Sequence, residues 1–270
     1  MRLSEIHPIV YHTRIAQKRL FRKLSDLAPG KNFASEKEDA DLPVMCTKHS
    51  SLLRRTLGNS DPQLQENKVV NLGIASPTID GILIKPGQLF SLWRQVGRTT
   101  AEKGYLDGMQ LSRGEVARGV GGGLCQLSNL LHWMVLHTPL TVAERHHHSF
   151  DPFPDDNRVL PFGSGCGVFY NYIDLRFYNP TNITFQLRVK VGENHLRGNI
   201  FADAAPENTY HIVEKGHRFF RSNGKTWRQN EIWREVIDRK TGNIVREEQL
   251  MKNLAEVKYE LNFEVPECNV

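Results

Sequence analysis

The 270-residue chain contains few cysteines, no long apolar run and no segment of low complexity. None of its four cysteines belongs to a C-x-x-C pair, which argues against a structural zinc site. Four cysteines in a chain of this length also do not indicate a disulfide scaffold. No stretch approaches the roughly 20 apolar residues that span a bilayer, and the first residues lack the apolar core of a signal peptide. We therefore expect a cytoplasmic protein with reduced thiols.

Nucleic-acid recognition also lacks its usual signals. The sequence contains no zinc-finger spacing, no aromatic RNA-binding motif and no dense Lys/Arg stripe outside the N-terminal region, so we expect no nucleic-acid partner and no cofactor. Hydrophobic residues make up 39% of the chain and charged residues 24%, a composition that can build a folded core. The net charge of +5 favours anionic surroundings without selecting one.

A basic amphipathic helix is expected from Tyr11 to Leu27. Apolar residues recur there near helical spacing, five basic residues lie between them, and Asp26 is the only acid. Ala28-Pro29-Gly30 ends the pattern. Such a helix either packs on its own domain as a solvated surface element or makes a peripheral contact with an anionic membrane through residues 11–27. In the second case the cytoplasmic protein would be membrane-associated.

Three regions follow from the changes of composition along the chain. Residues 1–65 form an N-terminal helical and irregular segment, of which 31–65 are polar and irregular. Residues 66–204 form a core domain, and residues 205–270 form a small β-rich extension. Within the core domain, the apolar runs between 69 and 93 suggest short strands or turns.

Strands are expected in the second half of the chain. Residues 140–150 and 168–178 each read as one strand, and residues 183–191 alternate cleanly between apolar and polar side chains. The turn at 192–194 then predicts a hairpin into 196–201. In the extension, turn clusters at 222–225 and 240–243 predict a small antiparallel meander.

The most distinctive stretch is the glycine-rich run that enters Cys125. Four glycines occur in the five positions 119–123, and a helical apolar pattern follows the cysteine and ends at Pro139. A helix N-terminus supplies unpaired N–H groups and lowers the pKa of a thiol placed there. Cys125 is thus either a reactive thiolate or a small buried residue after a tight turn. We expect an α+β fold in which this buried central helix packs on an antiparallel sheet.

A cysteine-dependent hydrolase or acyltransferase that acts on an amide is the first functional hypothesis. Cys125 would be the nucleophile, His148 the base and Asp174 the residue that orients the imidazole. A helix-borne cysteine followed by a histidine and an acid on strands is the order of papain-like and transglutaminase-like folds. Backbone N–H groups from Gly122 and Gly123 to Gln126 would hold the oxyanion.

Two alternatives remain open. Cys125 and His132 share a helix face and, with His146 or His148, could hold zinc; no further acid or cysteine completes that set, so we expect no metal. The other alternative is a non-catalytic binding or accessory module. Its groove is lined by aromatic residues: Trp93, Tyr105, Tyr170 and Tyr172.

The residues 67–203 resemble the VanW family. The resemblance is carried by several short segments and above all by a Gly-Gly-Gly-x-Cys-Gln-x-Ser block: 66–69, 81–87, 90–93, 121–131, 137–141, Arg145, His148 and 173–175. It implies a bacterial protein of the cell envelope or the glycopeptide response, and it implies no particular activity. A peptidoglycan-type peptide or precursor is the substrate expected under the cysteine hypothesis. It adds Ser128, Arg145 and Trp93 to the candidate substrate-binding residues.

One departure from the family pattern concerns Gly165. The family usually has a Gly-x-Asp-Ala segment where this chain has 163–166, so a glycine stands in place of an acid. If that acid serves the family's chemistry, this protein has lost it or uses Asp174.

Overall fold

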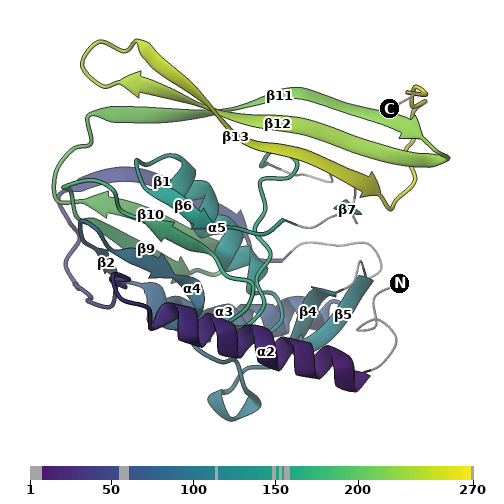
Figure 1. Cartoon of the computed structure of the whole chain (residues 1–270), viewed down its shortest axis with the longest axis horizontal. Coiled ribbons are helices and arrows are strands. Elements are labelled where there is room, and N and C mark those ends of the chain that lie inside the picture. The colour runs from purple at the N-terminus through teal and green to yellow at the C-terminus, as the bar shows by residue number, and fades with distance from the viewer. Residues whose placement is uncertain are drawn as a thin grey trace.

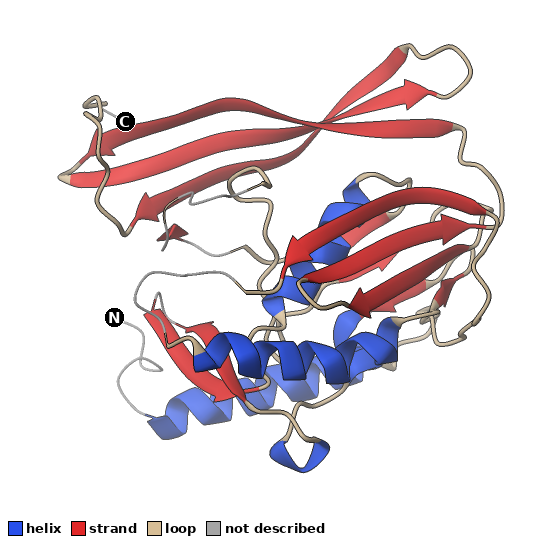
Figure 2. Ribbon diagram, turned by 180° about the vertical axis from the view of Figure 1, so that it is seen from behind, coloured by secondary structure: helices blue, strands red, loops and turns tan. Residues whose placement is uncertain are grey.

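The computed structural model describes residues 8–54, 61–112, 115–147, 150–151, 154 and 159–268. It is an α+β fold, as the sequence predicts, with antiparallel sheets and several helices (Figures 1 and 2). The helices are α2 (Pro8–Asp26), α3 (Gln63–Ile79), α4 (Leu92–Val96), α5 (Cys125–Leu136) and a 3₁₀ turn, Ala101–Lys103. Among the described residues, no helix is both long enough and apolar enough to cross a bilayer.

The central sheet has the strand order β1-β10-β9-β2, and all its neighbours are antiparallel. Its strands are β1 (Val44–Leu52), β10 (His195–Ala202), β9 (Phe185–Val191) and β2 (Leu83–Ile84). The β9–β10 hairpin confirms the strand predicted at 183–191 and the hairpin predicted into 196–201. Helix α5 packs on β1 and β10, and α3 packs on β9. The approach of α5 is close, because a Cβ at Gly198 would lie under 3.0 Å from Met134 and Leu130.

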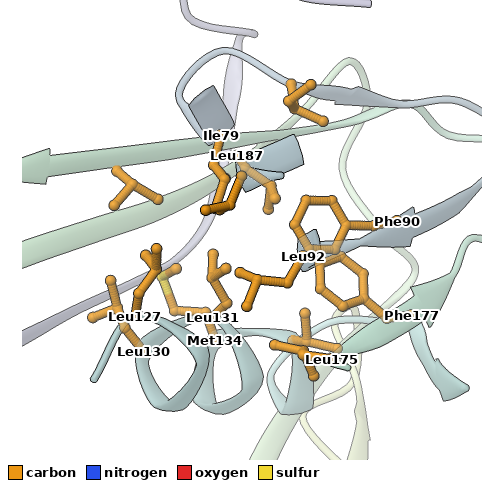
Figure 3. Close-up of a cluster of buried hydrophobic side chains, with 14 of the residues drawn as sticks. Ile79, Phe90, Leu92, Leu127, Leu130, Leu131, Met134, Leu175, Phe177 and Leu187 are labelled. Atoms are coloured by element: carbon orange, nitrogen blue, oxygen red, sulfur yellow. The ribbon is translucent and has the colours of Figure 1, made fainter. Parts of the chain in front are cut away.

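A second, smaller sheet completes the core. Its order is β3 (Leu89–Ser91), β8 (Arg176–Tyr178) and β6 (Thr141–Glu144). Phe90 and Phe177 stack between β3 and β8 with ring centroids 4.4 Å apart. Both rings are fully buried and lie beside the apolar face of α5, where Leu131 and Met134 close the cluster (Figure 3).

The C-terminal region is an antiparallel meander, as predicted, and its strands are long. Its strands are β11 (Asn208–Ser222), β12 (Lys225–Asp238) and β13 (Ile244–Val257), and the short β7 (Phe150–Asp151) runs parallel to β13. The meander lies across the side of the molecule opposite α2 (Figure 1). A buried ion pair of 2.9 Å between Arg228 on β12 and Asp151 on β7 fastens it to the rest of the chain.

Two predictions of local structure are wrong in the first half of the chain. Residues 63–79 form helix α3 and not strands or turns, since the buried positions Leu64, Leu72, Ala75 and Ile79 follow helical spacing. The region 31–65 contains strand β1, which pairs with β10 along eight residues. Because β1 lies at the edge of its sheet, it carries polar Lys, Ser and His side chains. Its sequence therefore lacks the apolar pattern by which a strand is recognised.

Two predicted strands of the second half are shorter than expected. The strand predicted at 140–150 ends at Glu144, and the strand predicted at 168–178 contains only β8. Between them the chain turns, with Asn171 at φ 55°. Tyr170 and Tyr172 lie in a loop against α2, and the backbone of residues 164–166 is bound to α5, so alternation in this stretch does not indicate a strand.

Candidate functional site

Helix α5 begins at Cys125 because the glycine run turns the chain sharply into it. Gly121 and Gly123 have φ values of 76° and 92°, which favour glycine. Between them, Gly122 packs against the ribbon formed by β4 (Asp107–Ser112) and β5 (Glu115–Val120). A Cβ at Gly122 would lie under 3.0 Å from the backbone of Gly108. The glycines therefore allow two backbones to meet directly below the cysteine.

The backbone amides that the sequence assigns to an oxyanion hole donate hydrogen bonds to backbone carbonyls of the protein itself. The N–H of Gly122 donates to Gly119 O at 3.0 Å, that of Gly123 to Met109 O at 2.8 Å, and that of Gln126 to Gly123 O at 3.1 Å. The Gln126 side-chain amide donates to the backbone of β1, at Leu52 O (2.8 Å). Each of these groups holds the turn or joins α5 to its neighbours.

The polar face of α5 binds one loop, residues 163–168, which we call the covering loop. Ser128 Oγ donates to Cys166 O at 2.6 Å, and Asn129 Oδ1 accepts from Cys166 N at 2.6 Å. One turn further along, His132 Nδ1 lies 2.9 Å from Ser164 O. Because a carbonyl only accepts, the proton of this neutral ring is on Nδ1. Three side chains on one helix face thus satisfy the backbone of the covering loop.

Arg145 holds the same loop from the other side. Its Nε and Nη2 donate to Gly165 O at 3.0 and 2.7 Å, and Nη2 also donates to Gly163 O. Burial lowers the pKa of Arg145. Gly165 itself lies in contact with Asn129, and a Cβ there would be 3.4 Å from Asn129 Oδ1.

Cys125 lies beneath the covering loop. The residue keeps some exposed surface, yet burial raises the pKa of its thiol. Hydrogen bonds from the N–H groups of Val168 and of Cys125 itself oppose this rise but do not reverse it. The neighbouring Cys166 is fully buried, and burial raises its pKa to about 12.

His132 is the most strongly shifted histidine of the site. It is 1% exposed, and burial, together with the charge of Arg145, lowers its pKa to about 3. The folded protein therefore holds His132 neutral, whereas the unfolded chain protonates it below about pH 6.5.

This shift predicts a loss of stability in mild acid. Below pH 6.5 the unfolded state binds a proton that the folded state excludes, so the free energy of unfolding falls as the pH falls. His132 alone contributes about 2 kcal/mol of this loss between pH 7.5 and pH 5. Urea unfolding of the wild type and of His132→Asn at both pH values measures it. Equal pH dependence of the two proteins would contradict the assignment.

Asp174 is fully buried and accepts three hydrogen bonds. The donors are Ser91 Oγ at 2.6 Å, Arg176 Nε at 2.8 Å and the N–H of Trp93 at 3.2 Å. Burial raises the pKa of Asp174, and these bonds oppose the rise. Its carboxylate thus joins β8 to the start of α4.

A chain of buried and partly buried charges continues from Asp174 to α2, and we call it the ion-pair cluster. Arg176 binds both oxygens of Asp26 at 2.6 and 2.7 Å, and Arg22 binds both oxygens of Glu144 at 2.6 Å. Glu144 also accepts from the N–H of Asp174 at 3.0 Å. Burial favours the neutral form of Asp26, but its bond to Arg176 lowers the pKa overall. The cluster therefore docks α2 on the core through opposite charges.

The histidine candidates near Glu144 are His146 and His148. His148 lies outside the described residues, so its role as base stays a prediction. His146 is exposed and lies 3.1 Å from Glu144. Within the described part of the chain, no group of three or more His, Cys, Asp or Glu residues is arranged to hold a metal ion.

The aromatic residues of the alternative hypothesis do not form an open groove. Trp93 is 6% exposed, its Nε1 donates to Ile173 O at 2.9 Å, and Tyr105 is 3% exposed. Arg19 of α2 lies over the Tyr170 ring at 5.2 Å, and Lys18 lies over the Tyr172 ring at 5.5 Å. Helix α2 thus covers the tyrosines where that hypothesis places a ligand.

Sequence reasoning missed Asn129 and most of the ion-pair cluster. Asn129 lies four residues after Cys125, on the same helix face, so helical spacing could have identified it. The partners Arg22–Glu144 and Asp26–Arg176 lie more than a hundred residues apart. No local pattern pairs them.

The chain is an α+β protein in which a glycine-rich turn leads into a central helix, and this sequence pattern is that of a known family. The family model described as "VanW like protein" matches residues 67–201, and the chain belongs to this family. The chain is 32% identical to the vancomycin B-type resistance protein VanW of Enterococcus faecalis, over 99% of this chain and 98% of that protein. It is 31% identical to the uncharacterized protein YoaR of Bacillus subtilis, over 44% of this chain and 38% of that protein. No solved structure matches the chain.

Proposed function

We propose that this VanW family member is a non-catalytic accessory protein of the envelope response to glycopeptides. The link to vancomycin resistance comes from the name of its relative. The absence of catalysis is proposed on one observation: the polar face of α5 is engaged by the covering loop (Ser128, Asn129 and His132). In this account the Gly-Gly-Gly-x-Cys-Gln-x-Ser block builds the centre of the fold.

The environment of Cys125 supports the proposal. Catalysis by cysteine requires a thiolate near neutral pH, whereas burial raises the pKa of this thiol. The amides of Gly122, Gly123 and Gln126 already donate to backbone carbonyls, so they have no hydrogen left for an oxyanion.

A cysteine-dependent amide hydrolase or acyltransferase, acting on peptidoglycan-type peptides, is the second candidate. It is favoured by the position of Cys125 as the first residue of α5, with part of its surface exposed, and by backbone N–H groups of Val168 and Cys125 that oppose the rise of its thiol pKa. In this candidate His148 is the base and Asp174 orients it, as in the papain-like or transglutaminase-like order. That order stays a prediction.

Substitution of Cys125 separates the two candidates. In a bacterium whose growth in a glycopeptide depends on this chain, we expect Cys125→Ala to preserve growth, because no bond is made or broken at the sulfur. Cys46→Ala, in the edge strand β1, is the matched control. Thermal unfolding of both purified variants first establishes that each one folds. Loss of growth with Cys125→Ala, while the folded protein and the Cys46→Ala control persist, would favour the hydrolase.

A further inference from the structure

Helix α2 docks on the core with its polar side. The residues that turn inward follow one helix face at spacings of three and four: Tyr11, Ile15, Arg19, Arg22 and Asp26. Their contacts are ion pairs, a hydrogen bond from Arg19 to Tyr170 O at 3.1 Å, and a cation–π contact on the same ring. The ion-pair cluster therefore fixes which side of the helix faces outward.

The outward side of α2 is apolar. Leu20, Phe21, Leu24 and Leu27 are 58%, 71%, 56% and 72% exposed, and Ile9 near the start of the helix is 69% exposed. At about 100° per residue, these side chains share one half of the helix surface with the neutral residues Thr13, Ala16 and Gln17. Surface helices normally bury this stripe, so its exposure on α2 reverses the usual arrangement.

Exposed cations border the apolar stripe on both sides. Arg14 and Lys18 lie along one border and Lys23 along the other, and all three are exposed. The helix has one acid, Asp26, whose side chain is 7% exposed and is paired with Arg176 and Lys31. An apolar stripe between two rows of cations matches the interface of an anionic bilayer, where acyl chains meet negative headgroups.

We propose that α2 is a membrane-surface helix that holds this protein on anionic lipid, with its apolar stripe at the level of the headgroups. Docking of a second copy on the same stripe is disfavoured, because it would bring the cation rows of the two helices together. The β11–β13 meander, on the opposite side of the molecule, would then face away from the lipid (Figure 1). The proposal is independent of the role of Cys125.

Co-sedimentation of the full chain with lipid vesicles tests this proposal. We expect binding to vesicles that mix phosphatidylglycerol with phosphatidylcholine, and much weaker binding to phosphatidylcholine alone. The double variant Leu20→Asp/Leu24→Asp should bind at least about tenfold more weakly, since it removes two apolar anchors from the stripe. Replacing Arg14, Lys18 and Lys23 by Gln should weaken binding about fivefold for each cation removed.

The matched control places the same charges on another exposed apolar pair. Ile244→Asp/Val245→Asp changes residues that are 52% and 57% exposed on β13, and it should bind vesicles like the wild type. Circular dichroism establishes that each variant folds. Failure of the wild type to bind anionic vesicles, or equal binding by Leu20→Asp/Leu24→Asp, would overturn the proposal. So would a dimer in analytical ultracentrifugation that the same double variant dissociates.

Discussion

Replacing Arg176 by alanine is expected to lower the free energy of unfolding by about 3–5 kcal/mol, because it removes the cation that binds two buried carboxylates and leaves Asp26 only the more distant Lys31, at 3.6 Å. The side chains of Arg176, Asp26 and Asp174 are 4%, 7% and 0% exposed, and all their charges face one another. Urea unfolding measures the loss. Hydrogen exchange should in addition show faster exchange along α2, since Asp26 is one of its attachments to the core.

The exposed pair Arg54–Glu66 supplies the control for Arg176. Its side chains are 45% and 50% exposed at a similar distance of 2.6 Å, so water replaces the bond when Arg54→Ala removes it. We expect that variant to unfold like the wild type. An Arg176→Ala protein as stable as Arg54→Ala, with unchanged exchange in α2, would show that the ion-pair cluster does not hold the helix.

Gly122→Ala is expected to destabilise the protein by about 3 kcal/mol or more, because the new methyl group meets backbone rather than a movable side chain. A Cβ at this position would lie under 3.0 Å from three backbone atoms of Gly108. Either the β4–β5 ribbon or the turn into α5 must move to admit it. Thermal unfolding of the purified variant measures the effect.

Gly73→Ala is the control substitution, and we expect it to stabilise the protein. Gly73 lies in the interior of α3, it is exposed, and a Cβ there would meet nothing within 4 Å. Alanine should therefore raise the stability by about 0.5–1 kcal/mol through helix propensity. If Gly122→Ala were as harmless as Gly73→Ala, the direct backbone contact below Cys125 would not exist.

The sequence predicted the elements whose patterns are local. The α2 and α5 helices, the β9–β10 hairpin and the C-terminal meander all follow from periodicity and turn residues, and the chain has the α+β class that these elements imply. The sequence also identified the glycine turn before Cys125, since few other arrangements need four glycines in five positions. The predicted division at residues 1–65, 66–204 and 205–270 stays a prediction, although β1 from the first region pairs with β10 in the second.

The site was less accessible to sequence reasoning, because its contacts are long-range. Ser128 and Arg145 were expected to bind a substrate or an oxyanion, and in the structure each donates to a carbonyl of the covering loop. The sequence of residues 163–168 contains no pattern that predicts their contact with α5. Likewise Asp174 was expected to orient a histidine, and its three donors come from Ser91, Trp93 and Arg176. Only the folded chain brings these groups together.

The most direct measurement of the role of Cys125 is the rate at which its thiol reacts with iodoacetamide in the native protein, followed peptide by peptide from pH 6 to pH 9. Cys268, a half-buried cysteine near the C-terminus, is the internal reference. Because burial raises the pKa of Cys125, we expect it to react more slowly than Cys268 throughout, with a rate that is still rising at pH 9. Faster reaction at Cys125 than at Cys268 near pH 7, with a plateau below pH 8, would reveal a thiolate and contradict the account.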